Sequence, residues 1–122
     1  MDRKLGKARR LLEMAYIKLL MAERVRRNKE IRRNLMLAAM IGRVPIMPET
    51  IANMYYRAAI SDIKKARKKL EKILEVEESL NADMLDVLRE VIWILSSCEG
   101  KDLIRMRMDL EKSIRMLGML AG

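Results

Sequence analysis

The side chains that could do chemistry in this chain are almost all lysine and arginine. Its 122 residues include 26 Lys and Arg against 17 Asp and Glu, with one Cys and no His. Without His there is no imidazole base, no usual zinc ligand set and no Ser-His or Cys-His nucleophile pair. The lone Cys98 falls in an apolar segment, where a small buried side chain is expected. We therefore expect a protein that is not an enzyme and uses no cofactor or metal.

The positive charge is concentrated in two segments. One is the basic stretch 23–34, and the other lies in the next predicted helix, where like charges four residues apart repel by a few tenths of a kcal/mol per pair. The like charges are explained if they form a stripe that binds an anion. The alternative interpretation is a face that is only solvated. The candidate anion-binding residues are Arg24, Arg26, Arg27, Lys29, Arg32, Arg33, Arg57, Lys64, Lys65, Arg67, Lys68 and Lys69.

The two halves of the chain differ in charge. Residues 1–69 carry 19 Lys and Arg against 6 Asp and Glu, a net charge of +13, whereas residues 70–122 carry 7 against 11, a net charge of −4. The basic half should bind a polyanion such as nucleic acid or an anionic membrane face. The acidic half could fold back on it or meet the basic half of a neighbouring subunit.

Four helices must position these charges. Residues 9–41 contain no Pro or Gly and predict one helix roughly 50 Å long. Its two ends, 11–22 and 35–41, are apolar around most of the circumference, so we expect both to be covered on more than one side. Gly42 should end this helix, and the short link before the second helix, about 49–79, makes the two helices antiparallel.

The second helix has the clearest periodicity in the chain. A strict four-then-three spacing predicts a coiled-coil seam whose small residues let two backbones approach closely. This seam consists of Ala52, Tyr56, Ala59, Ile63, Ala66, Leu70 and Ile73. Because the helices are antiparallel, we expect their basic middles to lie together and merge into one patch.

Two shorter helices follow. Asn81 predicts an N-cap for residues 82–97, Gly100 ends that helix, and Asp102 caps the last one, which extends through Leu120. Trp93 lies off the apolar stripe, so we expect it to pack on another element or a partner. The last helix is apolar on both flanks, which predicts self-association.

The predicted fold is all-α, a single domain 1–122 in which a long antiparallel helical hairpin, 1–79, is followed by two shorter helices, 80–122, in a helical bundle. The absence of Gln and His with 35% charged residues is typical of heat-adapted proteins. No segment has the roughly 20 apolar residues of a membrane-spanning helix, and no signal peptide is recognisable. We expect a cytoplasmic protein whose contact with a membrane would be peripheral.

Residues 24–69 resemble the helical hairpin of archaeal ESCRT-III proteins, the cell-division filament formers of the CdvB type. The residues that carry the resemblance are Arg27-Asn28-Lys29-Glu30-Ile31, then Leu35, Ala39 and Gly42, then Tyr56-Arg57-Ala58-Ala59-Ile60-Ser61-Asp62-Ile63-Lys64-Lys65. The resemblance implies a non-enzymatic subunit that polymerises, lays a basic face on anionic lipid and remodels the membrane. It also implies an AAA ATPase partner, although such an ATPase grips a proline-containing tail and no proline follows Pro48 in these residues.

Two other functions are alternatives to an ESCRT-III-like function. A helical protein that binds nucleic acid without sequence preference would use the same basic patch, but base-stacking aromatic residues are few. An enzyme is suggested only by Ala22-Glu23-Arg24, which is similar to a segment of small helical chorismate mutases, and the surrounding charged positions do not match.

Overall fold

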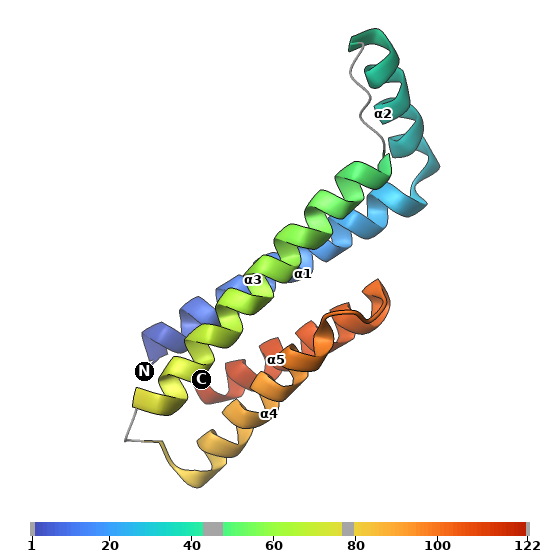
Figure 1. Ribbon diagram of the computed structural model, residues 1–122. Helices are drawn as coiled ribbons and strands as arrows, with labels where there is room; N and C mark the ends of the chain where they lie inside the picture. The colour runs from blue at the N-terminus through green and yellow to red at the C-terminus, as the bar shows by residue number, and fades with distance from the viewer. Residues whose placement is uncertain (1, 43–47, 77–79, 122) are drawn as a thin grey trace.

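A computed structural model describes residues 2–42, 48–76 and 80–121 of the chain. Within those ranges the protein contains helices and no strand, which confirms the predicted all-α class. The helices are α1 (Asp2–Arg27), α2 (Lys29–Gly42), α3 (Pro48–Val76), α4 (Ala82–Cys98) and α5 (Leu103–Ala121). In Figure 1, α1 and α3 lie side by side in opposite directions, α4 and α5 form a shorter pair along them, and α2 projects from one end.

The contact between α1 and α3 is the longest in the molecule. Both helices alternate alanine with a larger residue at coiled-coil spacing, so each Ala leaves room for the facing helix. In α1 the fully buried residues are Leu5, Ala8, Leu12, Ala15, Leu19 and Ala22. In α3 the predicted seam is confirmed, since all of its members are buried except Tyr56, which is half-buried.

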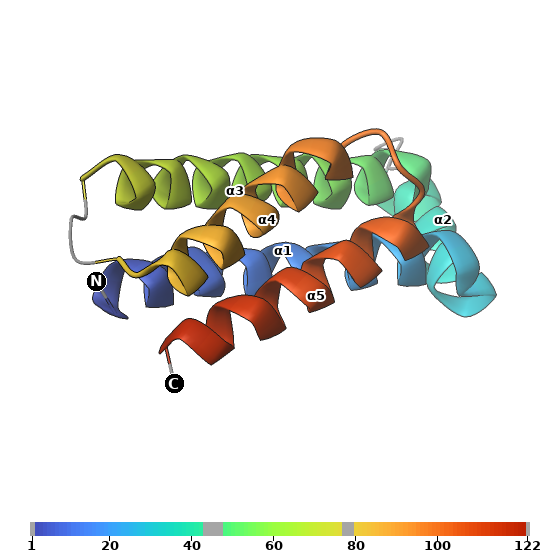
Figure 2. The ribbon, with the colours of Figure 1, turned by 90° about the horizontal axis from the view of Figure 1, so that it is seen from below.

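The shorter pair closes the other side of the core. As Figure 2 also shows, α5 packs on α1 and α4 packs on α3, which makes a four-helix arrangement. Leu88 and Leu95 of α4 and Leu110 and Leu117 of α5 join the same buried cluster as the α1–α3 seam. None of the described helices combines the length and the apolar character that crossing a bilayer requires.

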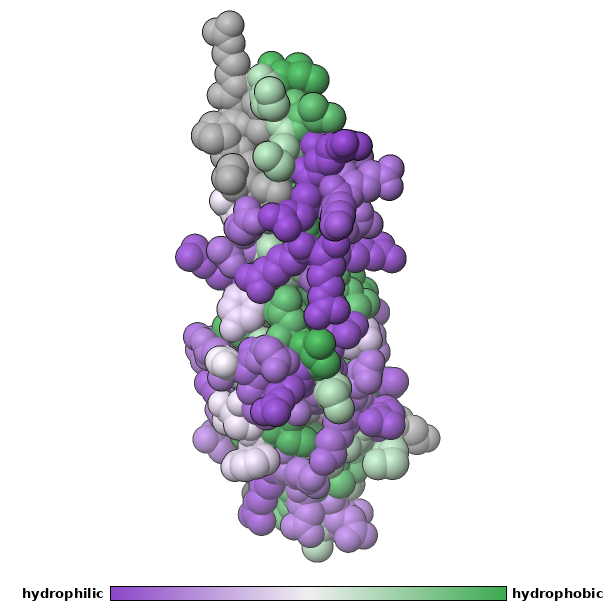
Figure 3. Space-filling model, turned by 90° about the vertical axis from the view of Figure 1, so that its right-hand side faces the viewer, coloured by the Kyte–Doolittle hydropathy of each residue, from purple (hydrophilic) through white to green (hydrophobic). Residues whose placement is uncertain are grey.

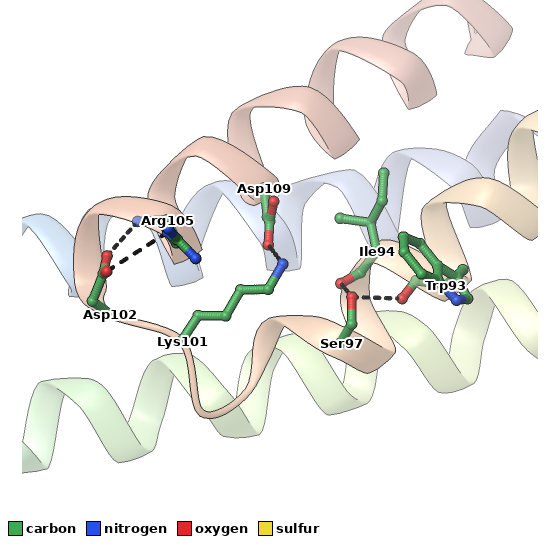
Figure 4. A network of polar contacts seen from close by, with 7 residues as sticks. All are labelled: Trp93, Ile94, Ser97, Lys101, Asp102, Arg105 and Asp109. Atoms are coloured by element: carbon green, nitrogen blue, oxygen red, sulfur yellow. Dashed lines mark hydrogen bonds and ion pairs between the residues drawn. The ribbon is translucent and has the colours of Figure 1, made fainter.

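The ends of α4 and α5 follow the predicted caps. Asn81 Oδ1 accepts a hydrogen bond of 2.9 Å from the backbone N–H of Met84, and Asp102 Oδ1 accepts one of 2.9 Å from the N–H of Arg105. Gly100, with φ of +92°, turns the chain between the two helices. Figure 4 shows this turn, where an ion pair of 2.8 Å between Lys101 Nζ and Asp109 Oδ2 ties the connection to α5.

The prediction of one helix over residues 9–41 is wrong. The helical backbone begins at Asp2 and is interrupted at Asn28, whose Oδ1 accepts a hydrogen bond of 3.0 Å from the N–H of Glu30. Asn28 thereby caps a new helix, α2, which starts at Lys29. The link 43–47, with Pro45, lies outside the described residues, as does the predicted end of the second helix at 77–79.

One expectation about apolar residues is also wrong. The apolar end of α2 was expected to be covered, but Met40 is 77% exposed and Ile41 85% exposed, because the break at Asn28 directs α2 away from the bundle (Figure 1). Among the α2 side chains that the structure describes, Leu35 packs on a small cluster formed by α1 and α3. Trp93 was expected to pack on another element or on a partner. Its side chain is 69% exposed in the single chain, and its packing on a partner stays a prediction.

Candidate functional site

The two basic segments do not form one patch. Arg26 Nη2 donates a hydrogen bond of 3.2 Å to Asn53 Oδ1, and Arg32 Nη2 lies 2.8 Å from Glu49 Oε1, so the first segment borders the beginning of α3. Lys64 follows Asn53 by eleven residues, about 16 Å along the helix. Because α2 turns away from α3, the lysines of the second segment lie apart from the first, and the predicted merging of the two whole segments is wrong. Arg57, four residues after Asn53 on α3, is the member of the second segment that lies near the first.

The first basic segment surrounds the junction of α1 and α2, and all six of its candidate side chains are exposed. Arg27 pairs with Glu23 at 3.1 Å and Arg32 pairs with Glu49 at 2.8 Å. The remaining four candidates have no ion pair with a described residue, namely Arg24, Arg26, Lys29 and Arg33. This junction therefore keeps a net positive charge.

The second basic segment lies on the middle of α3, between the N-terminal half of α1 and the solvent. Its candidates Arg57, Lys64, Lys65, Lys68 and Lys69 are exposed, and Arg67 is half-buried. Lys64 lies 3.7 Å from Glu99 of the α4–α5 turn, and Arg67 lies 3.6 Å from Glu71 on the same helix. Exposed pairs of this kind contribute little to stability, so this segment is a second, separate basic surface.

A groove runs along α2 and joins cationic to apolar side chains. It has a volume of about 470 Å³ and is lined by Lys29, Arg32, Arg33, Met36, Leu37 and Met40. The cations stand at the base of the helix and the apolar side chains toward its tip. Figure 3 shows the same division on the molecular surface, with a hydrophobic end above a hydrophilic band. An element of this kind can contact an apolar phase and an anionic layer at once.

A second groove separates α1 from the start of α5. It measures about 550 Å³, with Ile17, Leu20 and Met21 among its lining residues. At its edge the Glu23 carboxylate forms two ion pairs, with Arg27 at 3.1 Å and with Arg107 at 3.2 Å. The Glu23–Arg107 pair joins α1 to α5, which indicates a structural role for this charge cluster.

In the described part of the chain, no group of three or more Cys, Asp and Glu side chains could hold a metal ion. Burial raises the pKa of the Cys98 thiol to about 11, so the thiol is neutral at physiological pH. The hydrogen bond of 2.7 Å that Tyr16 donates to Glu111 raises the pKa of Tyr16 and links α1 to α5.

The sequence interpretation missed the apolar half of the α2 surface. Met36, Leu37, Met40 and Ile41 were expected to be buried in a long helix, yet all four are exposed. The signal that could have revealed them is local: Asn28, followed by Lys29 and Glu30, is a plausible N-cap within a helical run.

Comparisons of the chain with protein-family models, curated proteins and solved structures find no match. Its function is therefore inferred from its own surface.

Proposed function

We propose that this protein is a non-enzymatic structural protein that binds an anionic membrane surface through α2 and acts as an assembly of copies. The observation that carries the proposal is the surface of α2. Cations stand at the base of this helix, whereas Met40 and Ile41 extend from its tip with 77% and 85% of their side chains exposed. A short amphipathic helix of this composition suits the boundary between lipid headgroups and acyl chains.

The apolar tip favours a membrane over nucleic acid as the partner. Each cation near an anionic leaflet contributes roughly 1 kcal/mol, and the same cations could neutralise phosphates of a duplex. Burying a large apolar side chain contributes about 1.5–3 kcal/mol, and a bilayer offers the apolar phase that a duplex lacks. A partner that uses both halves of α2 therefore fits a lipid surface best.

Self-association completes the proposal. A single α2 holds a membrane weakly, and several linked copies bind much more tightly because their contacts act together. Exposed apolar side chains on α4 and α5 support contacts between copies, namely Trp93, Ile104, Met108 and Met119. With the antiparallel pairing of α1 and α3, these features are compatible with ESCRT-III-like membrane remodelling, the most specific form of this proposal.

Cosedimentation with vesicles tests the membrane contact. We expect the protein to bind phosphatidylserine-containing vesicles and to bind pure phosphatidylcholine vesicles much less at the same salt concentration. Replacing Met40 and Ile41 with serine should weaken binding at least about 100-fold, because roughly 3 kcal/mol of apolar transfer is lost. The fold should be unaffected, since the Met40 and Ile41 side chains are exposed.

The matched control replaces Met54 and Val76 with serine. These side chains are also well exposed, at 65% and 56%, but lie on α3 and outside the surface proposed for contacts between copies. This variant should bind vesicles like the wild type. The opposite result would be no binding to vesicles and tight binding to duplex DNA that the α2 serine substitutions do not change. That result would support the nucleic-acid alternative and contradict the membrane proposal.

A further inference from the structure

A separate basic hollow lies at the opposite end of the bundle, where the beginning of α1 meets the end of α3. It has a volume of about 220 Å³ and is lined by Lys4, Lys7, Lys69, Lys72 and Ile73. Among the candidates from the sequence, only Lys69 belongs to it. We call the four lysines the lysine cradle.

The helices that carry the cradle are held firmly. Leu5 and Leu70, each next to a cradle lysine in sequence, are fully buried, and Ile73 at the hollow itself is 1% exposed. The lysines of the cradle therefore start from backbone positions fixed by the α1–α3 core. Two come from each helix, so the arrangement depends on tertiary packing and not on a run of charges along one helix.

No acidic side chain from the described part of the chain lines the hollow. Lys7, Lys69 and Lys72 have no ion pair with any residue in the described part of the chain. Ammonium groups brought together around a hollow repel one another, and an anion held among them reverses that repulsion. Each ammonium also provides three N–H donors, which suit phosphoryl oxygens.

We propose that the lysine cradle binds a compact polyphosphate, an anion in which two or more phosphoryl groups are joined in one small molecule. One phosphate group carries about −1.5 to −2 charges at neutral pH, which is less than the three positive charges of Lys7, Lys69 and Lys72. A molecule with at least two phosphoryl groups matches the charge. A nucleic-acid backbone fits less well, because its charges are spread along a strand whereas the cradle is a single small hollow.

The cradle is independent of the membrane contact proposed for α2. Lys72 and Glu49 are separated by 23 residues of α3, about 35 Å along the helix, and Glu49 contacts the base of α2 through Arg32. Substitutions at one end should therefore leave binding at the other end unchanged. Failure of either proposal can be recognised without reference to the other.

Isothermal titration of the full chain with inorganic tripolyphosphate tests the cradle. We expect one anion per chain, bound less tightly as salt is added. Lys69→Gln/Lys72→Gln should weaken binding about 30-fold, the loss expected for two cations that each contribute roughly one lysine–anion contact. Lys7→Gln, on the other helix, should weaken it about fivefold by the same reasoning.

The matched control is Arg24→Gln/Arg57→Gln, which changes the net charge equally at exposed positions at least twelve residues of helix, about 18 Å, from the nearest cradle lysine on the same helix. This variant should retain affinity within about threefold, because exposed charges at that distance are screened. Equal weakening of the two double variants, or no binding of tripolyphosphate by the wild type, would overturn the proposal. Thermal unfolding followed by circular dichroism should show that Lys69→Gln/Lys72→Gln is no less stable than the wild type, since it relieves repulsion.

A second arm identifies the source of the phosphoryl groups. Phosphatidylcholine vesicles carrying a phosphatidylinositol bisphosphate are tested with the Met40→Ser/Ile41→Ser protein, so that α2 does not contribute. Vesicle binding that is lost on adding Lys69→Gln/Lys72→Gln indicates a lipid headgroup as the natural ligand. Tripolyphosphate binding without vesicle binding indicates a polyphosphate free in solution. Vesicle binding that survives the lysine substitutions contradicts the cradle as the lipid site.

Discussion

Ser113 provides a direct test of how α5 packs in the core. Its side chain is fully buried in the stripe that contains Leu110 and Leu117, and its Oγ has no hydrogen-bond partner. A buried hydroxyl without a partner destabilises a fold by about 1–3 kcal/mol. We therefore predict that Ser113→Ala stabilises the protein.

The expected gain has two parts. Alanine is a better helix former than serine by about 0.5 kcal/mol at any position inside a helix. Removing the unpaired hydroxyl should add about 1 kcal/mol, at the low end of its range because a small gap remains. For 122 residues, 1 kcal/mol corresponds to about 4 °C in Tm. Ser113→Ala should thus raise Tm by about 6 °C.

Ser61→Ala separates these two parts, because Ser61 is exposed in the middle of α3. Urea unfolding followed by circular dichroism should give a gain near 0.5 kcal/mol for Ser61→Ala and about 1 kcal/mol more for Ser113→Ala. A Ser113→Ala protein that is less stable than the wild type would refute the reasoning. It would show that the hydroxyl donates to a backbone carbonyl or a buried water.

Three further predictions concern other parts of the chain. Lys18→Met should lower the free energy of unfolding by about 3 kcal/mol, because it leaves the buried Asp62 carboxylate, now 2.6 Å from Lys18 Nζ, without its partner. Adding Asp62→Leu should restore most of that loss in urea unfolding, and an unrestored double variant would contradict this view of the pair. Burial raises the pKa of Cys98 from 9.0 to about 11, so the unfolded chain loses the thiol proton first. The stability that the neutral thiol contributes is therefore complete below pH 9 and lost as the pH rises toward 11. Relative to Cys98→Ala, the wild type should lose up to about 2 kcal/mol across that interval, and parallel pH curves would argue against it. Amide hydrogen exchange in residues 36–41 should be fast in solution and slow on anionic vesicles, and equal rates in both conditions would count against docking of α2.

The features that the sequence could predict are those governed by nearby residues. The seam of α3 repeats for seven positions at one spacing, so its burial followed from periodicity alone. Asn81, Gly100 and Asp102 act through backbone atoms only a few residues away, and their caps were found where the sequence placed them. Local signals of this kind do not depend on how distant parts of the chain pack.

The interruption at Asn28 could not be predicted with the same certainty. Asparagine inside a helix is less favourable than alanine by well under 1 kcal/mol, so one Asn among strong helix formers is compatible with a continuous helix. Tertiary packing decides the matter here, because α3 begins at Pro48 and pairs with α1 over residues 2–27.

The position of the basic surfaces depended on that same interruption. A helix over residues 9–41 has its centre near Val25, whereas the segment that pairs with α3 has its centre near Met14. The difference of eleven residues shifts the register by about 16 Å. Arg24–Arg33 therefore moved to the beginning of α3, and the N-terminal lysines Lys4 and Lys7 came to face Lys69 and Lys72.

The projection of α2 from the bundle affects the stability of this helix. A helix of 14 residues is marginally stable in water by itself, and α2 packs on the bundle only near its base. Its exposed Met40 and Ile41 gain nothing from the fold of a single chain, although each could contribute about 1.5–3 kcal/mol when buried. Burial on a membrane would therefore stabilise the helix and the attachment together, and the arginines at its base would draw it to an anionic surface first. On this reasoning we predict that α2 is the least stable helix of the isolated protein, and that the proposed membrane contact supplies the packing that the chain does not.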